Sequence, residues 1–417
     1  MMRSLFYYLK RLLSVGSILI VSACSVVPAV TNPASATPSP STATPLSLRL
    51  SPTLSPASPT AIALPAATPV ATTTALLHQR VPITVSTTPV SVTAGTVHSL
   101  RLHDQKAERL VMDDTHLYWV LREERHRIYR YPLAGGEIEL VAQTEFPDGE
   151  LGLLSLRRSG DWLIFVDTPL SEQGITWKMH ALNVRNNTDQ VILEEKNEIY
   201  SWPGPCIDTD GDWLVWTQTQ SSKTEDCVDT VLARLNLRTQ ESHDIERVCA
   251  ETNWMWMFPQ LSEDYLVVER DLPDNKGRGN DLYLYNFTTA QMLALTDNRE
   301  SSMPGLAMPW IVWKAAPRFS FGPTALYNIE TGEYRFIPVD YNDPFINGRW
   351  VYWKTDALTP LYVYDVEANQ LLVVATPGEN ENIEARTIHG NMIAWSRDLE
   401  FEHTAPSDSL IEWRVLP

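Results

Sequence analysis

The stretch 208–220, DTDGDWLVWTQTQ, combines two signals that point to different structures. Its first half follows the opening of the calcium-loop pattern D-x-[DN]-x-[DN]-G. Its second half, Trp213-Leu-Val-Trp216, is a short apolar run of the kind that forms a buried β-strand. A calcium loop also requires a bidentate Glu at its twelfth position, where this chain has Thr219. The choice between a metal site and a strand depends on whether the run recurs.

The apolar run recurs along the chain with a conspicuous last position, which is Trp in five copies, Phe in one and Val in one. Successive copies are 40 to 52 residues apart. A short polar turn such as SGD, DGD or NGR precedes every copy except the fifth, so DTDGD occupies a turn before a strand and suits it conformationally. We therefore predict no metal site here. The seven copies are 116–119, 162–165, 213–216, 265–268, 310–313, 350–353 and 392–395.

Each copy belongs to a larger unit of four short β-strands. A strand precedes the polar turn, as in GLLSLRR (152–158), and two more follow the apolar run, as in TALYNIE (324–330) and YRFIPVD (334–340). Four strands in about 45 residues, repeated seven times, predict a β-propeller. One blade cannot bury both faces of its sheet, whereas neighbouring blades can. The alternative is a β-sandwich or two β domains in tandem, and seven aligned copies argue against it.

The last unit is short, because only LIEWRVLP (410–417) follows its apolar run and loop, and it lacks an outermost strand. Strand-like sequence without a blade of its own precedes the first unit, namely VPITVSTTPVSV (81–92) and GTVHSLRL (95–102). We predict that one of the two, within about 80–103, completes the last blade. Such a closure removes the exposed sheet edges that an open ring would leave.

The repeats resemble those of TolB-like propellers. The clearest match is SEDYLVVERDLPDNKGRGNDLYLYNF (262–287), WSRD (395–398) echoes the start of its loop, and LYNIETGEYRFIP (326–338) has the family's strand, TGE turn and strand. The resemblance covers residues 105–417 and implies a propeller without implying one activity, because members have varied roles. The family usually closes with six blades, so six is the alternative to the seven counted here.

The N-terminus has the layout of an export signal, with basic residues in MMRSLFYYLKR (1–11) and a short apolar run over 12–21. Val21-Ser22-Ala23-Cys24 resembles a bacterial lipobox, which implies cleavage after residue 23 and acylation of Cys24. An ordinary signal peptide or an uncleaved anchor is the alternative. Residues 24–77 are rich in Pro, Ser, Thr and Ala, which predicts a disordered tether to a propeller over 78–417. The expected location is extracytoplasmic, on a membrane.

Charge excludes one class of partner. All 51 acidic residues lie in 104–417 with 27 of the 33 basic ones, so this part carries 27 − 51 = −24 within a chain total of −18. A nucleic-acid ligand requires a basic stripe, and none is present. Anionic lipids and polyanions are disfavoured for the same reason, whereas cationic ligands, metal ions and neutral polymers are not.

The three remaining cysteines, Cys206, Cys227 and Cys249, all fall in the third unit, at places that a four-stranded blade brings to one rim. An exported protein permits a disulfide there, with the pairs Cys206–Cys227 and Cys227–Cys249 both open. Loops on the same rim are the expected functional surface. Aromatic residues beside acids there suit a sugar, a peptide or a cationic group; the alternative is that the tryptophans pack between blades. The candidate rim residues are Tyr200, Trp202, Trp254, Trp256, Arg270 and Asp271.

No motif for nucleophilic, metal-dependent or nucleotide-dependent catalysis is present in the sequence, and no cofactor is expected. We therefore predict a monomeric, non-enzymatic, lipid-anchored binding module for a protein, peptide or glycan. The alternative is a saccharide-active hydrolase or lyase that uses acidic residues near the axis of the propeller. A purely structural component of the cell envelope is a third possibility.

Overall fold

The structure is a computed structural model of the 417-residue chain. The described residues belong to the compact unit Pro69–Pro417. None of them forms a helix long and apolar enough to span a membrane. They are 76–77, 82–84, 88–92, 95–144, 152–168, 170–171, 174–197, 205–221, 228–250, 255–274, 277–317, 320–339, 342–354, 359–400 and 407–417.

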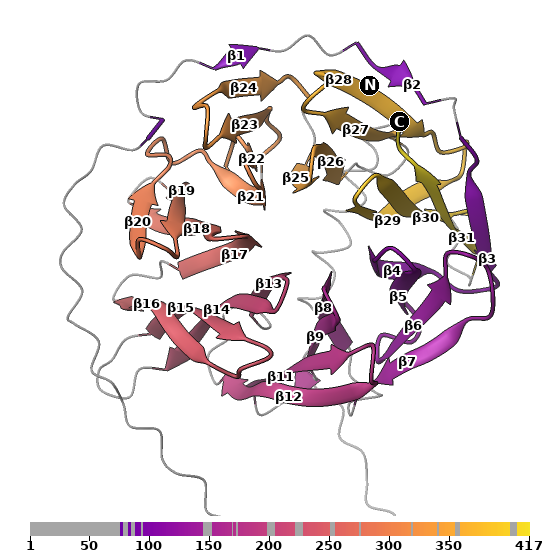
Figure 1. The fold of residues 1–417 in the computed structure, drawn as a ribbon, viewed down its shortest axis with the longest axis horizontal. Coiled ribbons are helices and arrows are strands. Elements are labelled where there is room, and N and C mark those ends of the chain that lie inside the picture. The colour runs from indigo at the N-terminus through magenta and orange to yellow at the C-terminus, as the bar shows by residue number, and fades with distance from the viewer. Residues whose placement is uncertain are drawn as a thin grey trace, which may run out of the picture. The chain divides into compact units, whose positions relative to one another are not determined.

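Seven antiparallel sheets form the blades of a ring, each with its first strand nearest the axis (Figure 1). Blade 1 contains β4 (Ala107–Met112), β5 (His116–Leu121), β6 (Arg127–Pro132) and β7 (Glu139–Gln143). Blade 2 contains β8 (Gly152–Ser159), β9 (Trp162–Thr168), β11 (Gly174–Asn183) and β12 (Thr188–Asn197), with β10 (Leu170–Ser171) beside β11. Blade 3 contains β13 (Cys206–Asp210), β14 (Trp213–Ser221), β15 (Val228–Asn236) and β16 (Ser242–Ala250).

Blade 4 contains β17 (Met255–Ser262), β18 (Tyr265–Asp274), β19 (Gly277–Asn286) and β20 (Gln291–Ala294). Blade 5 contains β21 (Ser302–Ala307), β22 (Trp310–Lys314), β23 (Thr324–Asn328) and β24 (Tyr334–Ile337). Blade 6 contains β25 (Asn342–Asn347), β26 (Trp350–Lys354), β27 (Leu361–Asp365) and β28 (Gln370–Ala375). Blade 7 contains β29 (Asn382–His389), β30 (Met392–Asp398), β31 (Ser409–Val415) and β3 (His98–Leu102). The prediction of an all-β propeller with seven four-stranded blades is confirmed, and the six-bladed alternative is wrong.

The hydrophobic core is divided among the gaps between blades. The described residues form seven clusters of buried side chains, and each joins the facing sides of two neighbouring blades. The repeated aromatic position lies in these clusters and is at most 7% exposed in all seven blades. Trp216, for example, packs with residues of blade 2, and Trp395 with residues of blade 6. The repeat thus reflects one packing requirement that each of the seven blades meets. Truncating one of these tryptophans to Ala would lower the free energy of unfolding by about 3–5 kcal/mol.

The ring is completed by a strand from before the first blade. β3 pairs antiparallel with β31, from His98 opposite Trp413 to Leu102 opposite Ser409. Leu102 is 3% exposed and enters the cluster between blades 7 and 1. The segment 95–102 therefore fills the place that the short last unit leaves open.

The other strand-like segment, 81–92, has a different role on the outside of the ring. β1 (Ile83–Thr84) adds in parallel to β24 of blade 5, and β2 (Val90–Ser91) adds in parallel to β28 of blade 6 (Figure 1). Leu76 N and Leu77 N donate to the carbonyls of Ala294 and Leu295 of blade 4 at 3.0 and 3.2 Å. Contacts with the propeller thus begin two residues before the predicted boundary at 78.

The aspartates of DTDGDW connect blade 3 to both of its neighbours. Asp208 and Asp210 accept hydrogen bonds from the backbone N–H groups of Leu261 and Glu263 in blade 4, at 2.8 and 2.7 Å. Asp212 accepts one from Trp162 Nε1 of blade 2 at 3.1 Å. Gly211, between them, has φ +57°, which a residue without a side chain adopts at no steric cost. The carboxylates therefore point toward different blades and serve the turn rather than one shared ligand.

Candidate ligand-binding site

The sequence-predicted rim is described only in part. Cys24, Tyr200, Trp202, Trp254 and Cys227, and the side chain of Cys249, lie outside the described residues. Cys206, at the start of β13, has a free thiol, and burial raises the pKa of this thiol. No disulfide therefore includes Cys206 in this structure.

Trp256 occupies the packing position that was the alternative to a ligand-binding role. It is 3% exposed and belongs to the cluster between blades 3 and 4. Its ring packs edge-on against Tyr283 with centroids 5.3 Å apart, and the Arg270 guanidinium lies 5.6 Å from its centroid. Asp271 is also 3% exposed. An aromatic side chain this deeply buried is not available to a ligand, so the prediction of Trp256 as an exposed rim residue is not supported by its position.

Carboxylates with perturbed pKa values lie at the seam between blades 7 and 1. Burial and the charge of Asp398 raise the pKa of Glu384, and burial raises the pKa of Asp398. Each has a cationic partner across the seam, since Lys106 Nζ lies 3.2 Å from Asp398 and Arg122 pairs with Glu384. Arg122 Nε also lies 2.7 Å from Glu108. This arrangement holds the seam together, because its charges are used in contacts between the blades that close the ring.

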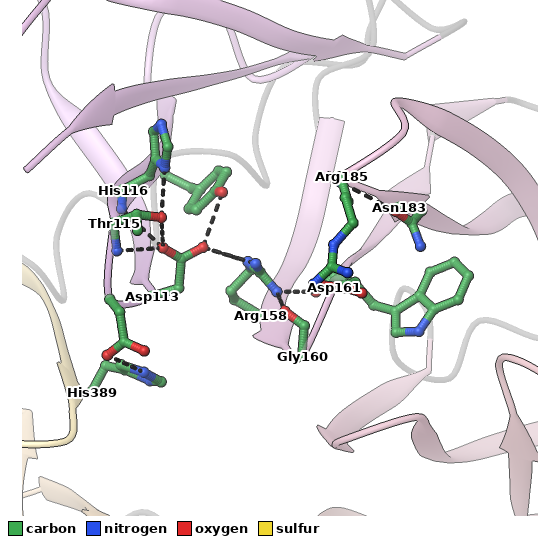
Figure 2. A network of polar contacts seen from close by, with 12 residues as sticks. Asp113, Thr115, His116, Arg158, Gly160, Asp161, Asn183, Arg185 and His389 are labelled. Carbon is green, nitrogen blue, oxygen red and sulfur yellow. Dashed lines mark hydrogen bonds and ion pairs between the residues drawn. The ribbon is translucent and has the colours of Figure 1, made fainter.

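Polar contacts also join neighbouring blades at the rim that carries the turns between first and second strands (Figure 2). Asp113 of blade 1 accepts a hydrogen bond from Arg158 Nε of blade 2 at 3.0 Å and from the N–H groups of Thr115 and His116. On the other side of blade 1, His389 Nε2 lies 3.2 Å from Asp114. Burial alone would raise the pKa of Asp113, but the hydrogen bonds from Thr115 and His116 and the charge of Arg158 hold it at about 2.

We expect Asp113→Asn to lower the free energy of unfolding by about 2 kcal/mol at pH 7. The carboxylate has a pKa of about 2 in the folded state against 3.8 ordinarily, so its contribution is complete above pH 4 and disappears as the pH falls toward 2. Urea unfolding of both proteins at pH 7 and pH 3 measures this difference. Asp114→Asn is the control, because the Asp114 side chain is 91% exposed and its loss should cost under about 0.5 kcal/mol. Equal losses for the two variants would contradict the assignment.

A cluster of cations lies on the first strands of blades 1 and 2, next to the axis. Arg109 of β4 sits in a β-bulge with φ +49°, and its Nε donates to the carbonyl of Leu153 in β8 at 2.8 Å. Arg157 of β8 has its Nε 3.4 Å from Asp208 of β13. Burial raises the pKa of Asp208 to about 6, so this acid is still mostly ionised at pH 7 and is the counterion of Arg157.

A pair of aromatic rings lies on blade 6, and a third arginine, Arg386 of β29, lies on blade 7 between blade 6 and blade 1 (Figure 1). Tyr352 of β26 stacks on Phe345 of β25 with ring centroids 5.4 Å apart, and Phe345 is 36% exposed. Burial raises the pKa of Tyr352 to about 12, and the charges of Arg157, Arg386 and Asp208 also act on it. Blade 6 is no neighbour of blades 2 and 3, so the interactions of Tyr352 with Arg157 and Asp208 run across the axis of the ring, whereas Arg386 belongs to the neighbouring blade 7. We define the axial cluster as Arg109, Arg157, Asp208, Phe345, Tyr352 and Arg386.

Arg386 of β29 is the member of the axial cluster with the least internal compensation. Burial lowers the pKa of Arg386 to about 10, so it stays charged at neutral pH. Its Nη1 is buried and has no hydrogen-bond partner among the described residues. The two acids that act on it are engaged elsewhere, Asp343 3.9 Å from Lys314 Nζ and Glu384 with Arg122. The axial cluster thus holds three guanidinium groups and Asp208, and the other acids that act on its arginines, Glu108, Asp343 and Glu384, are paired with cations outside the cluster.

We expect Arg386→Met to raise the free energy of unfolding by about 1–3 kcal/mol, because it removes a buried charge whose removal leaves no acid unpaired. Chemical denaturation at pH 7.5 measures the change. Arg122→Met should have the opposite effect, since Arg122 neutralises two carboxylates at the seam. A loss of stability in Arg386→Met would show that this arginine has a structural role.

Comparisons with known proteins add the fold and no activity. No protein-family model and no curated protein matches the chain. An oligogalacturonate lyase in complex with manganese superposes with TM-score 0.51 at 13% identity, over 81% of this chain and 97% of the lyase. The β-propeller domain of the Trilobed protease from Pyrococcus furiosus gives 0.52 at 11% identity, over 74% and 95%.

Two further solved structures match over a smaller share of their own length. Pyrococcus horikoshii acylaminoacyl peptidase gives TM-score 0.52 at 15% identity over 73% of this chain and 50% of the peptidase. TolB from Acinetobacter baumannii gives 0.41 at 15% identity over 61% of this chain and 62% of TolB. This chain therefore spans less than two thirds of the length of either protein. Together with the seven sheets, the matches above 0.5 establish a β-propeller.

Proposed function

We propose that the protein is a non-enzymatic binding module, exported and held at a membrane through Cys24, which presents its propeller to a protein, peptide or glycan. The observation that carries the proposal is the contrast between two charged clusters. The carboxylates at the seam are neutralised by Lys106 and Arg122, as in a structural contact. Arg386 of the axial cluster has no ion pair among the described residues, and its buried Nη1 also lacks a hydrogen-bond partner there, as in a site that binds an anionic ligand.

The N-terminal sequence supports this setting. The basic start, the apolar run over 12–21 and the Val-Ser-Ala-Cys sequence favour export and acylation of Cys24. Residues 24–77 would then space the propeller from the membrane, since their composition cannot bury a core. Cys24→Ala should release the protein from the membrane fraction and abolish labelling with a fatty-acid probe; unchanged fractionation and labelling would contradict the anchor.

Binding is tested by capture from envelope extracts with a propeller that begins at residue 75, so that the contacts of Leu76 and Leu77 are kept. We expect one or a few components to be retained by the wild-type propeller and lost from an Arg386→Gln/Arg157→Gln double variant that unfolds at no lower temperature. Retention of the same components by an unrelated propeller would show that capture is non-specific. Turnover of a saccharide by the purified protein, abolished in Glu384→Gln, would instead establish the enzymatic alternative.

A further inference from the structure

We propose that the axial cluster binds a single carboxylate group of a ligand whose body is uncharged or apolar, an inference that rests on the binding function proposed above. Sequence composition alone argues for cationic or neutral ligands, because the residues from 104 onward carry a net charge of −24. Three arginines nevertheless lie on the first strands of three consecutive blades, nearest the axis: Arg386 in blade 7, Arg109 in blade 1 and Arg157 in blade 2 (Figure 1). Asp208 of blade 3 faces Arg157, and the acids that act on Arg386 have cationic partners of their own.

The donor geometry suits a carboxylate. A guanidinium presents parallel N–H groups that match the two oxygens of a carboxylate, and such charged hydrogen bonds are about twice as strong as neutral ones. Arg386 Nη1 is buried without a partner among the described residues, so a ligand oxygen would satisfy a group that the protein leaves unsatisfied. The Nε of Arg109 is already directed at a backbone carbonyl, which fixes this side chain in place.

The surroundings of the cluster limit what carries the carboxylate. A polyanion requires a track of unpaired cations, whereas Arg122, Arg125 and Arg157, whose side chains are 35–40% exposed, all lie 3.4 Å or less from an acid. A chain with many negative charges would also be repelled by the acidic exterior. Phe345 and Tyr352 present a stacked pair of rings, 5.4 Å apart, that suits an apolar side chain or the face of a sugar ring. One carboxylate on a body without further charge satisfies both conditions.

Two matched pairs of small probes test the proposal on the full chain. N-acetyl-phenylalanine is compared with its amide, and D-galacturonate with D-galactose, by ligand-observed NMR titration at low salt. Within at least one pair we expect the acid to bind about tenfold or more tightly than its neutral partner, which corresponds to about 1.4 kcal/mol. Which pair shows the preference distinguishes a peptide source from a uronic-acid source, and either result supports the proposal. Equal binding of acid and neutral forms in both pairs, or tighter binding of inorganic phosphate, would overturn it.

Variants locate the site. Arg386→Gln should abolish the preference for the acid and leave the melting temperature equal or higher. Arg185→Gln is the control, because Arg185 is 79% exposed in the turn between β11 and β12 and its ion-pair partner, Asp161, is not a member of the axial cluster. It should leave the preference unchanged. A preference that survives in Arg386→Gln, or that Arg185→Gln also abolishes, would overturn the assignment to the axis.

The outcome also separates this inference from the proposed function. Capture of an envelope component that persists in Arg386→Gln, with no preference for acids, would refute the carboxylate site and leave the binding function standing. A clear preference for acids with no specific capture from envelope extracts would support the site and contradict the proposed role as a binding module for a protein or other large ligand.

Discussion

A chain that begins at residue 105, without the closing strand β3, is expected to melt at least about 10 °C below the full-length protein and to aggregate on heating. β3 contributes the whole outer ladder of blade 7, with five residue pairs from His98 to Leu102. It also buries Leu102 between blades 7 and 1 and stacks His98 on Trp413, with ring centroids 5.5 Å apart. Its loss exposes β31 as an unpaired edge, which is a template for pairing with another chain.

A chain that begins at Gly95 is the matched control. It lacks β1 and β2, which contribute two residue pairs each on the outside of blades 5 and 6, but it keeps β3. We expect a fall of only a few degrees, because each kcal/mol corresponds to about 2–4 °C in a domain of this size or somewhat smaller. Differential scanning calorimetry with light scattering measures both quantities. If the two shortened chains melt together, ring closure contributes little and the role assigned to β3 is wrong.

The propeller could be predicted because its packing repeats along the chain. Every blade must fill the gap to the preceding blade, and the chain fills it at one position with Trp119, Phe165, Trp216, Val268 and the equivalent tryptophans of blades 5 to 7. Ring closure could be predicted because a short last unit leaves an edge. These requirements are local in sequence or recur at a regular interval, so a single sequence reveals them.

The axial cluster could not be predicted in the same way. Arg157 and Arg386 belong to blades 2 and 7, and a single sequence contains no signal that links two residues so far apart. β-bulges in the first strands also change which side chains reach the axis, and these bulges put Arg109, Phe258 and Met303 at positive φ. Glycine is the residue that signals such a conformation, and it is absent at these positions. The aromatic loops, in contrast, attracted a functional interpretation, yet Trp256 packs between blades.

Lys106→Met is expected to lower the free energy of unfolding by about 3–5 kcal/mol at pH 7.5, the usual effect of removing one partner of a buried ion pair. The Lys106 side chain is 10% exposed and its partner Asp398 is fully buried, with Nζ and Oδ2 3.2 Å apart. Met fills a similar volume, so the loss reports the uncompensated carboxylate rather than a cavity. Arg130→Gln in the same blade is the control, because the pair of Arg130 with Glu139 is exposed and contributes under about 1 kcal/mol.

The pH dependence identifies the carboxylate responsible. Burial raises the pKa of Asp398 and Lys106 opposes this rise, so in Lys106→Met the pKa of Asp398 increases further. A buried acid with a raised pKa destabilises the folded state when ionised, and it regains that stability as the pH falls through its folded pKa. Lys106→Met should therefore approach the wild type at pH 5, and Lys106→Met/Asp398→Asn should recover most of the loss at pH 7.5. A loss that is independent of pH and persists in the double variant would mean that Lys106 stabilises the seam through packing of its aliphatic chain, and the ion pair would contribute nothing to closing the ring.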